Sequence, residues 1–280
     1  VKTIEEFGSQ GDWPSNLQLL DWLAVDFRKN GWDVKRMLKQ MILSATYRQS
    51  SRASSSLVEL DPENRLLSRG PRFRLQAEFI RDTILAASGI LIRDIGGRGV
   101  KPYQPPGLWN ELSLGGNVRF VQDHGTKLYR RGMYTYWKRS APAPSLTIFD
   151  TPTREKCVLR RSRTNTPLQA LVLLNDPQYI EAARSLAQKV TLEAGDSVIA
   201  RIVLAYRLAT AHRPSAKTLT LLKKAYEEEL AVFQKDPERA RKLLTVGESK
   251  RDEKFDAAEH AALTIISSMI LNLDATVTKG

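Results

Sequence analysis

The segment from Tyr129 to Arg163 holds most of the side chains in this chain that could do chemistry. Nine of its residues are basic and two, Asp150 and Glu155, are acidic, so the segment carries +7 of the chain's net charge of +12. It also holds five aromatic residues. Concentrated positive charge beside flat aromatic faces suits an anionic or sugar-like ligand.

The arginines between Arg154 and Arg163 come directly before a predicted helix start at Thr166. A helix start offers free N–H groups, and guanidinium groups match the paired oxygens of carboxylate, sulfate or phosphate. The segment is therefore a candidate anion site, in which Trp137 or Tyr134 would stack on a sugar. The alternative is a structural network of arginines paired with acidic residues elsewhere. The candidate ligand-binding residues are Trp137, Lys138, Arg139, Arg154, Arg160, Arg161, Gln169 and Asn175.

Two residues are candidates for catalysis. Asp150 would act as a general base or an orienting carboxylate that the neighbouring arginines keep ionised; the alternative is a turn residue before a proline. His124 is the histidine to test, because it lies in the irregular middle of the chain. His212 falls at a helix end, and the spacing puts His260 on the polar face of a helix. The sequence does not show whether the chain has an enzymatic reaction.

No group of histidines, cysteines or carboxylates has the spacing of a metal site, and no haem attachment motif is present. The one cysteine, Cys157, excludes an internal disulfide. Adjacent cations could activate its thiol, but a buried, inert thiol is the simpler interpretation.

The composition is that of a soluble globular protein, with 42% hydrophobic and 26% charged residues. An isoelectric point near 9.8 favours acidic partners, whether nucleic acid, anionic glycan, an anionic surface or an acidic protein. The apolar stretches are too short or too interrupted to span a bilayer, and there is no signal peptide. Because the chain opens at Val1 without a methionine, we expect it to be an excerpt of a longer protein.

The pattern of apolar residues predicts a mainly α fold, in which one helical domain carries a long irregular Gly/Pro-rich middle and at most a short β-hairpin. Residues 1–88 and 165–280 are the helical parts, and residues 89–164 are the irregular basic and aromatic part of this single domain. A short strand is expected from Met133 to Trp137.

Several positions carry signals for the start of a helix. Gln169 would complete a capping box with Thr166, and a helix break is expected near Asn175. The expected helices span 14–30, 74–88 and 254–273, and further starts are expected at Asp33, Asp61-Pro62, Thr166, Asp176-Pro177, Asp196 and Ser215.

Several strings occur in this order along the chain: Leu20-Asp21-Trp22-Leu23-Ala24, Leu43-Ser44-Ala45-Thr46-Tyr47-Arg48-Gln49-Ser50, Asp61-Pro62-Glu63-Asn64-Arg65-Leu66-Leu67, Lys101-Pro102-Tyr103-Gln104-Pro105-Pro106-Gly107-Leu108-Trp109, Tyr136-Trp137-Lys138-Arg139, Phe149-Asp150, Arg163-Thr164-Asn165-Thr166-Pro167-Leu168-Gln169-Ala170-Leu171 and Leu174-Asn175-Asp176-Pro177. Together they resemble the PSD1 domain (DUF1553) of planctomycetes and verrucomicrobia. Relative to that family the N-terminus looks truncated, and Gly97-Arg98-Gly99 departs from the usual pattern.

The resemblance implies context more than chemistry. Family members look like C-terminal parts of large exported proteins, so haem c is expected on a separate upstream domain and no cofactor in this chain, with an extracytoplasmic location. No activity can be carried over.

Two hypotheses follow: the domain binds or processes an anionic polysaccharide, sulfated or carboxylated, or it is a non-catalytic scaffold whose basic segment docks on an acidic partner or upstream domain. The charge alone also permits nucleic-acid binding, but no recognised motif supports it.

Overall fold

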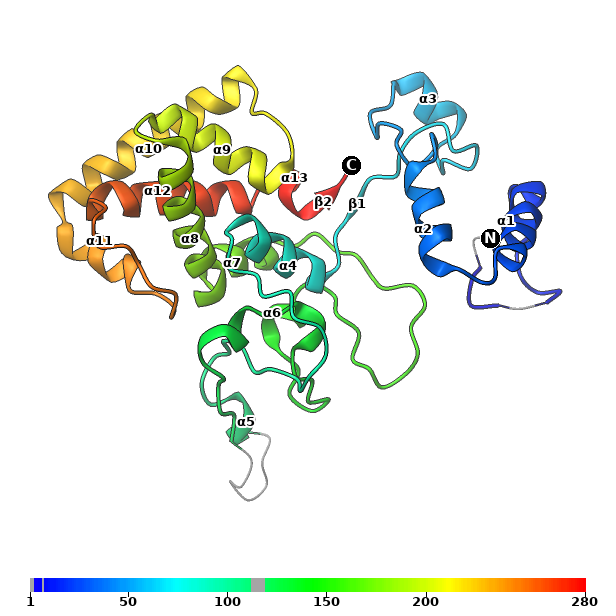
Figure 1. The fold of residues 1–280 in the computed structure, drawn as a ribbon, viewed down its shortest axis with the longest axis horizontal. Coiled ribbons are helices and arrows are strands. Elements are labelled where there is room, and N and C mark those ends of the chain that lie inside the picture. Colours follow the sequence, from blue (N-terminus) through cyan, green and yellow to red (C-terminus); the bar gives the residue numbers. More distant parts are fainter. Residues whose placement is uncertain (1–2, 7, 112–118) are drawn as a thin grey trace. The chain divides into compact units, whose positions relative to one another are not determined.

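The computed structural model describes residues 3–6, 8–111 and 119–280 (Figure 1). Val1, where the sequence predicts a truncation, and residues 112–118 of the predicted irregular part lie outside the described residues. The chain divides into two compact units. The first consists of Val1–Phe73 with Lys279–Gly280, and the second of Arg74–Thr278.

Three helices form the first unit, and none of their described residues is buried. Side-chain oxygens of Asn16, Asp33 and Ser54 accept hydrogen bonds from backbone N–H groups of the first turns. The predicted cap at Asp33 is therefore confirmed. The helices are α1 (Leu17–Lys29), α2 (Val34–Leu43) and α3 (Ser55–Leu60).

Asp61 does not begin a helix, contrary to the prediction for Asp61-Pro62. It follows the end of α3, and its buried carboxylate accepts hydrogen bonds from the backbone N–H groups of Arg65, at 2.7 Å, and Leu66, at 2.9 Å. Aspartate before proline suits a turn as well as a helix cap, and here the turn forms.

The second unit is almost entirely helical among its described residues, so the predicted mainly α fold is confirmed. Two-residue strands, β1 (Phe73–Arg74) and β2 (Thr278–Lys279), pair where the chain passes from one unit to the other. The helices are α4 (Ala77–Ala87), α5 (Leu108–Glu111), η1 (Gly125–Tyr129), η2 (Gly132–Tyr134), α6 (Pro144–Thr147), α7 (Pro167–Asn175), α8 (Pro177–Ala194), α9 (Val198–Thr210), α10 (Ala216–Lys235), α11 (Pro237–Leu244), α12 (Ala257–Leu271) and α13 (Asp274–Val277).

The core of the second unit lies where α8 packs against α12, with α9, α10 and α11 around this pair (Figure 1). Alanines on both helices let the backbones approach closely, as at Ala183 and Ala262, and larger side chains such as Leu186 and Ile266 fill the space beside them. His260 of α12 is buried, at 3% exposure, so its predicted place on the polar face is wrong. The helix has almost no polar face, because other helices cover most of its circumference.

Buried polar contacts hold the irregular middle of the chain against α4. The guanidinium of Arg81 donates to the side chain of Gln178, at 2.9 Å, and to the backbone carbonyls of Leu128 and Arg130. The carboxylate of Asp82 accepts a hydrogen bond from the N–H of Gly132 at 2.6 Å. These side-chain contacts satisfy backbone groups of a segment that has no regular helix or sheet to supply their hydrogen bonds.

The predicted strand from Met133 to Trp137 does not form. The 3-10 helix η2 covers its start, and only Thr135 pairs, through an isolated bridge to Val100. Two other details differ from the prediction: the cap of α9 is Ser197 rather than Asp196, and α11 was not expected. In the described part of the chain, no helix is long and apolar enough to cross a membrane.

Candidate functional site

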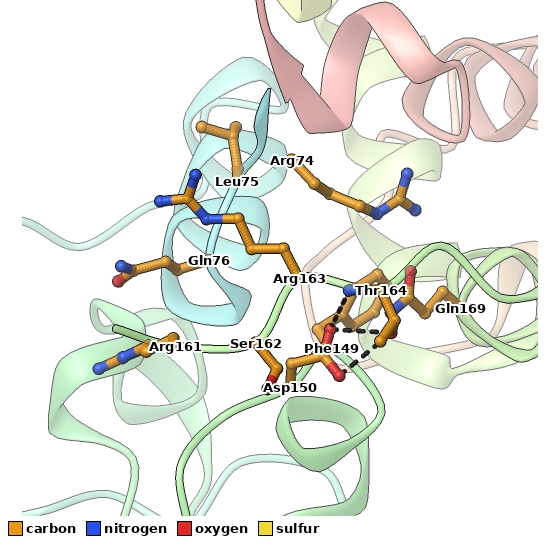
Figure 2. Close-up of a pocket in the computed structure, with 10 residues that line it drawn as sticks. All are labelled: Arg74, Leu75, Gln76, Phe149, Asp150, Arg161, Ser162, Arg163, Thr164 and Gln169. Atoms are coloured by element: carbon orange, nitrogen blue, oxygen red, sulfur yellow. Dashed lines mark hydrogen bonds between the residues drawn. The ribbon is translucent and has the colours of Figure 1, made fainter. Parts of the chain in front are cut away.

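The second half of the basic segment forms a long loop between α6 and α7 (Figure 1). Asp150 closes this loop, because its carboxylate accepts from the backbone N–H of Thr164 at 2.7 Å and from its hydroxyl at 2.9 Å (Figure 2). The backbone of Asp150 has a φ of 60°, a left-handed conformation that aspartate tolerates better than most residues. Both carboxylate oxygens therefore serve the loop's own structure.

Gln169 is buried and lines the same pocket. Its amide nitrogen donates to the carbonyl of Ile148 at 3.0 Å and to the hydroxyl of Thr164 at 3.1 Å. The predicted capping box is wrong, because Thr166 makes no side-chain cap to α7 and Gln169 points to the loop instead. Among the described residues its buried amide oxygen has no hydrogen-bond partner.

Three arginines line this site with Asp150 and Gln169. Arg161 makes an ion pair with Glu78 of α4, at 2.7 Å. Arg74 and Arg163 line other parts of the pocket (Figure 2). Burial lowers the pKa of Arg74, and the negative charges of Asp274 and Asp150 partly offset that effect. The enclosed space is about 10 Å³, which is roughly enough for one water molecule.

The two aromatic rings predicted to stack on a sugar carry cations on a face. The guanidinium of Arg154 lies 4.8 Å from the ring centre of Trp137, whose indole N–H donates to the carbonyl of Thr153. Arg130 lies 4.0 Å from the ring centre of Tyr134 and also donates to backbone carbonyls of the loop from Asp94 to Arg98. These cation–π contacts stabilise the segment internally.

A second aromatic cluster gathers around Trp109. Lys138 lies 4.6 Å from its ring centre and Lys101 lies 5.5 Å from it, while Tyr136 contacts the same ring at 5.9 Å. Trp109 is buried and Tyr136 is exposed. Lys138 is therefore the one predicted ligand-binding residue that the structure places in this cluster.

Four cations of the segment remain exposed and without an acidic partner in the described part of the chain: Arg139, Arg154, Lys156 and Arg160, of which Arg154 lies over the ring of Trp137. The side chains between Lys156 and Arg160 are exposed too, including Val158 and Leu159. Cys157 lies among them and is exposed, so its interpretation as a buried thiol is wrong. The loop places cationic and apolar groups together in solvent.

The remaining predicted site residues do not line the pocket of Asp150. The ring of His124 lies 2.6 Å from the carboxylate of Glu248, far along the chain, and this contact accounts for its position. Asn175 lines a separate cleft. The described residues contain no group of three histidine, cysteine or acidic side chains that could hold a metal ion.

The structure therefore brings Asp150, Arg161 and Gln169 together, and leaves Arg154 and Arg160 outside their pocket. Sequence reasoning missed Glu78 and assigned no role to Thr164. Nothing in the local sequence marks Glu78 as the partner of an arginine 83 residues away. The hydrogen bonds from Thr164 to the carboxylate of Asp150 could not be predicted either, since they depend on the path of the loop between them.

A mainly helical unit with a basic, water-sized pocket and an exposed basic loop defines a class of architecture but no reaction. The family model for PSD1, described as a protein of unknown function (DUF1553), matches residues 1–226. The chain belongs to this family. Comparisons with curated proteins and with solved structures each found no match. The matched region ends within α10, so α11 and α12 lie beyond it.

Proposed function

We propose that this chain is a non-catalytic docking module whose exposed loop, residues 151–163, binds an acidic protein surface. The observation that carries the proposal is that Lys156 and Arg160 stand in solvent without acidic partners in the described chain, while Arg130 and Arg161 are used internally. Unpaired exposed cations attract a partner of opposite charge and set the rate at which it associates.

An acidic protein suits this loop better than a polysaccharide. Val158 and Leu159 are exposed between the cations, at 39% and 57%, and apolar contacts of that kind are typical of protein interfaces. The rings of Trp137 and Tyr134 each have a face covered by an arginine, which leaves less room for sugar stacking. The pocket at the base of the loop is also far too small for a sugar ring.

The arrangement around Asp150 supports a structural role over catalysis. A general base must reach the proton that it removes, but both oxygens of this carboxylate accept hydrogen bonds from Thr164. The ion pair of Arg161 with Glu78 fixes the other side of the pocket. We infer that the pocket sets the conformation of the loop, and that the loop makes the contact.

One observation favours a second candidate, an anionic glycan. The exposed ring of Tyr136 lies in the cluster around Trp109, where Lys101 lies 5.3 Å from the ring centre of Tyr136 and Lys138 lies 4.6 Å from that of Trp109. Cations beside an exposed aromatic ring suit a sulfated or carboxylated sugar. In either case, we propose a partner outside the cytoplasm, as the family resemblance implies. An acidic surface on an upstream haem-carrying domain of the same polypeptide would satisfy the docking proposal.

The two candidates differ in what they bind. Isothermal titration should compare an acidic peptide in which leucines recur among glutamates with a sulfated oligosaccharide of equal charge. We expect the peptide to bind more tightly. Leu159→Ser should weaken its binding by roughly five- to thirtyfold, since burying a leucine side chain contributes on the order of 1–2 kcal/mol. Tighter binding of the oligosaccharide, with no effect of Leu159→Ser, would instead support the glycan.

A further inference from the structure

A second, larger cleft lies in the second unit, and none of residues 151–163 of the basic loop is among the described residues that line it. Its volume is about 520 Å³, within the range of small-molecule sites. Residues of the irregular middle, α6 and α7 form its apolar wall: Pro105, Pro106, Pro144, Ile148, Leu171 and Val172. Proline rings and branched aliphatic side chains present flat apolar faces, against which an aromatic ring packs well.

The charge of this cleft is opposite to that of the loop. No lysine, arginine or histidine is among the described residues that line it, and Asp176 is its one acidic residue. Burial raises the pKa of Asp176, and the hydrogen bond from the N–H of Gln178 opposes that change. An anion entering here would meet a carboxylate and no compensating cation, so the cleft selects against anions.

Amide groups supply the polar contacts of the cleft. Gln104, Gln122 and Asn175 line it together with Ser145. The amide nitrogen of Gln104 is buried, and in the described part of the chain it has no hydrogen-bond partner. An unpaired buried donor lowers stability until an acceptor reaches it. A rotation of the Gln104 side chain would bring this donor to the cleft, where a ligand with an uncharged oxygen acceptor would provide the partner.

We propose that this cleft binds a small uncharged aromatic molecule that carries a hydrogen-bond acceptor such as a carbonyl oxygen. The ring would pack between Pro105, Pro144 and Leu171, and the acceptor would receive a hydrogen bond from Gln104. The proposal does not depend on the docking loop, because the ligand of the cleft is uncharged whereas the partner of the loop is acidic.

Three probes of one shape test the proposal. 2-Acetylnaphthalene is uncharged and carries an acceptor, 2-ethylnaphthalene lacks the acceptor, and 2-naphthoate is anionic. Binding to the full chain should be measured through the fluorescence of each probe. We expect the ketone to bind most tightly and the hydrocarbon about fivefold more weakly, because a hydrogen bond is worth roughly 1 kcal/mol. The carboxylate should bind most weakly.

Matched variants assign the binding to this cleft. Leu171 in the cleft and Leu221 on α10 are both exposed helical leucines, at 54% and 59%. Leu171→Glu should weaken binding of the ketone at least tenfold, whereas Leu221→Glu should leave it unchanged. Gln104→Met should remove the preference for the ketone over the hydrocarbon.

The outcomes separate cleanly. Saturable binding with the expected order of probes and sensitivity only to Leu171→Glu supports the proposal. Absence of saturable binding, equal loss from the two glutamate variants, or tightest binding of the carboxylate overturns it. Retention of the ketone preference in Gln104→Met would overturn the assignment of Gln104 as the donor.

Discussion

At the residue scale, the most constrained point of the second unit is the buried carboxylate of Glu181. It accepts from the hydroxyl of Tyr129 at 2.8 Å and from the N–H of Ser249 at 2.5 Å, and the guanidinium of Arg184 lies 3.8 Å away. Burial of the phenol, together with its hydrogen bond to Glu181 and the negative charge of that side chain, raises the pKa of Tyr129. The loop after α11 is tied to the core through this side chain and through two others of α8: Arg184 donates to the carbonyl of Ser249, and Gln188 accepts from the N–H of Asp252.

Gly247 is where that loop crosses Glu181. Its φ is +86°, and a methyl group on it would meet the Glu181 side chain at 2.3 Å. Gly247→Ala should therefore destabilise the chain by about 3 kcal/mol or more, as strain and displacement of a buried ion pair add. Gly107→Ala, at φ +87° with open space around it, should cost only about 1–2 kcal/mol. Equal losses in urea unfolding would contradict this account.

His260 should make stability depend on pH. Burial lowers its pKa from 6.5 to about 4, and the nearby Arg251 and Arg184 also disfavour the charged form. The unfolded chain therefore takes up a proton that the folded chain does not, so stability falls as the pH drops from 6.5 towards 4, by roughly 3 kcal/mol at most.

The measurement is urea unfolding of the native chain and of His260→Gln at several pH values. The variant should lose less stability than the native chain over this interval, because the titrating group is gone. His212→Gln removes an exposed histidine and should leave the pH dependence as it is. A native slope in His260→Gln would show that the buried imidazole is not its source.

At the element scale, the loop of residues 151–163 is long but closed at both ends. At its base, the N–H of Thr164 donates to the carboxylate of Asp150. The indole of Trp137 donates to the carbonyl of Thr153, and Arg161 makes an ion pair with Glu78. Charged and apolar residues between these anchors extend into solvent. An anchored loop loses less conformational freedom on binding than a free one, which favours affinity.

A double-mutant cycle tests the anchor. Asp150→Ala and Thr164→Val remove the two sides of one contact, so their effects on stability should be non-additive by about 1 kcal/mol. Asp150→Ala and Arg160→Ala should be additive, because Arg160 does not line the pocket. Coupling between Asp150 and Arg160, with additivity at Thr164, would mean that the loop folds onto its arginines instead.

At the scale of the whole molecule, the folded core extends beyond the family match. The match ends at residue 226, whereas α12 lies at the centre of the second unit. A chain cut after residue 226 would expose the apolar faces of α8 and α9. We expect it to lack dispersed NMR signals and a cooperative unfolding transition, and a cooperatively folded fragment would contradict this view of the core.

The sequence predicted those features that depend on local pattern. Nearby residues determine the caps at Asp33, Asp176 and Ser215, and the absence of a large sheet from the part of the chain that the structure describes. Gln169 and His260 were misread for the opposite reason, since their environments come from segments distant in the chain. The position of the irregular middle could not be predicted either, because it depends on a hydrogen bond from Arg81 of α4 to Leu128, 47 residues along the chain.

The most direct test of the docking proposal compares two triple variants with the same change in charge. Arg154, Lys156 and Arg160 lie on the loop, and Lys217, Lys223 and Lys224 lie exposed on α10. Titration with the leucine-containing acidic peptide should show at least a roughly tenfold loss for the loop triple→Ala variant, since exposed ion pairs contribute up to about 1 kcal/mol each. The α10 triple→Ala variant should stay within about twofold of the native chain. Equal losses would mean that net charge alone attracts the partner, and would contradict a docking site on this loop.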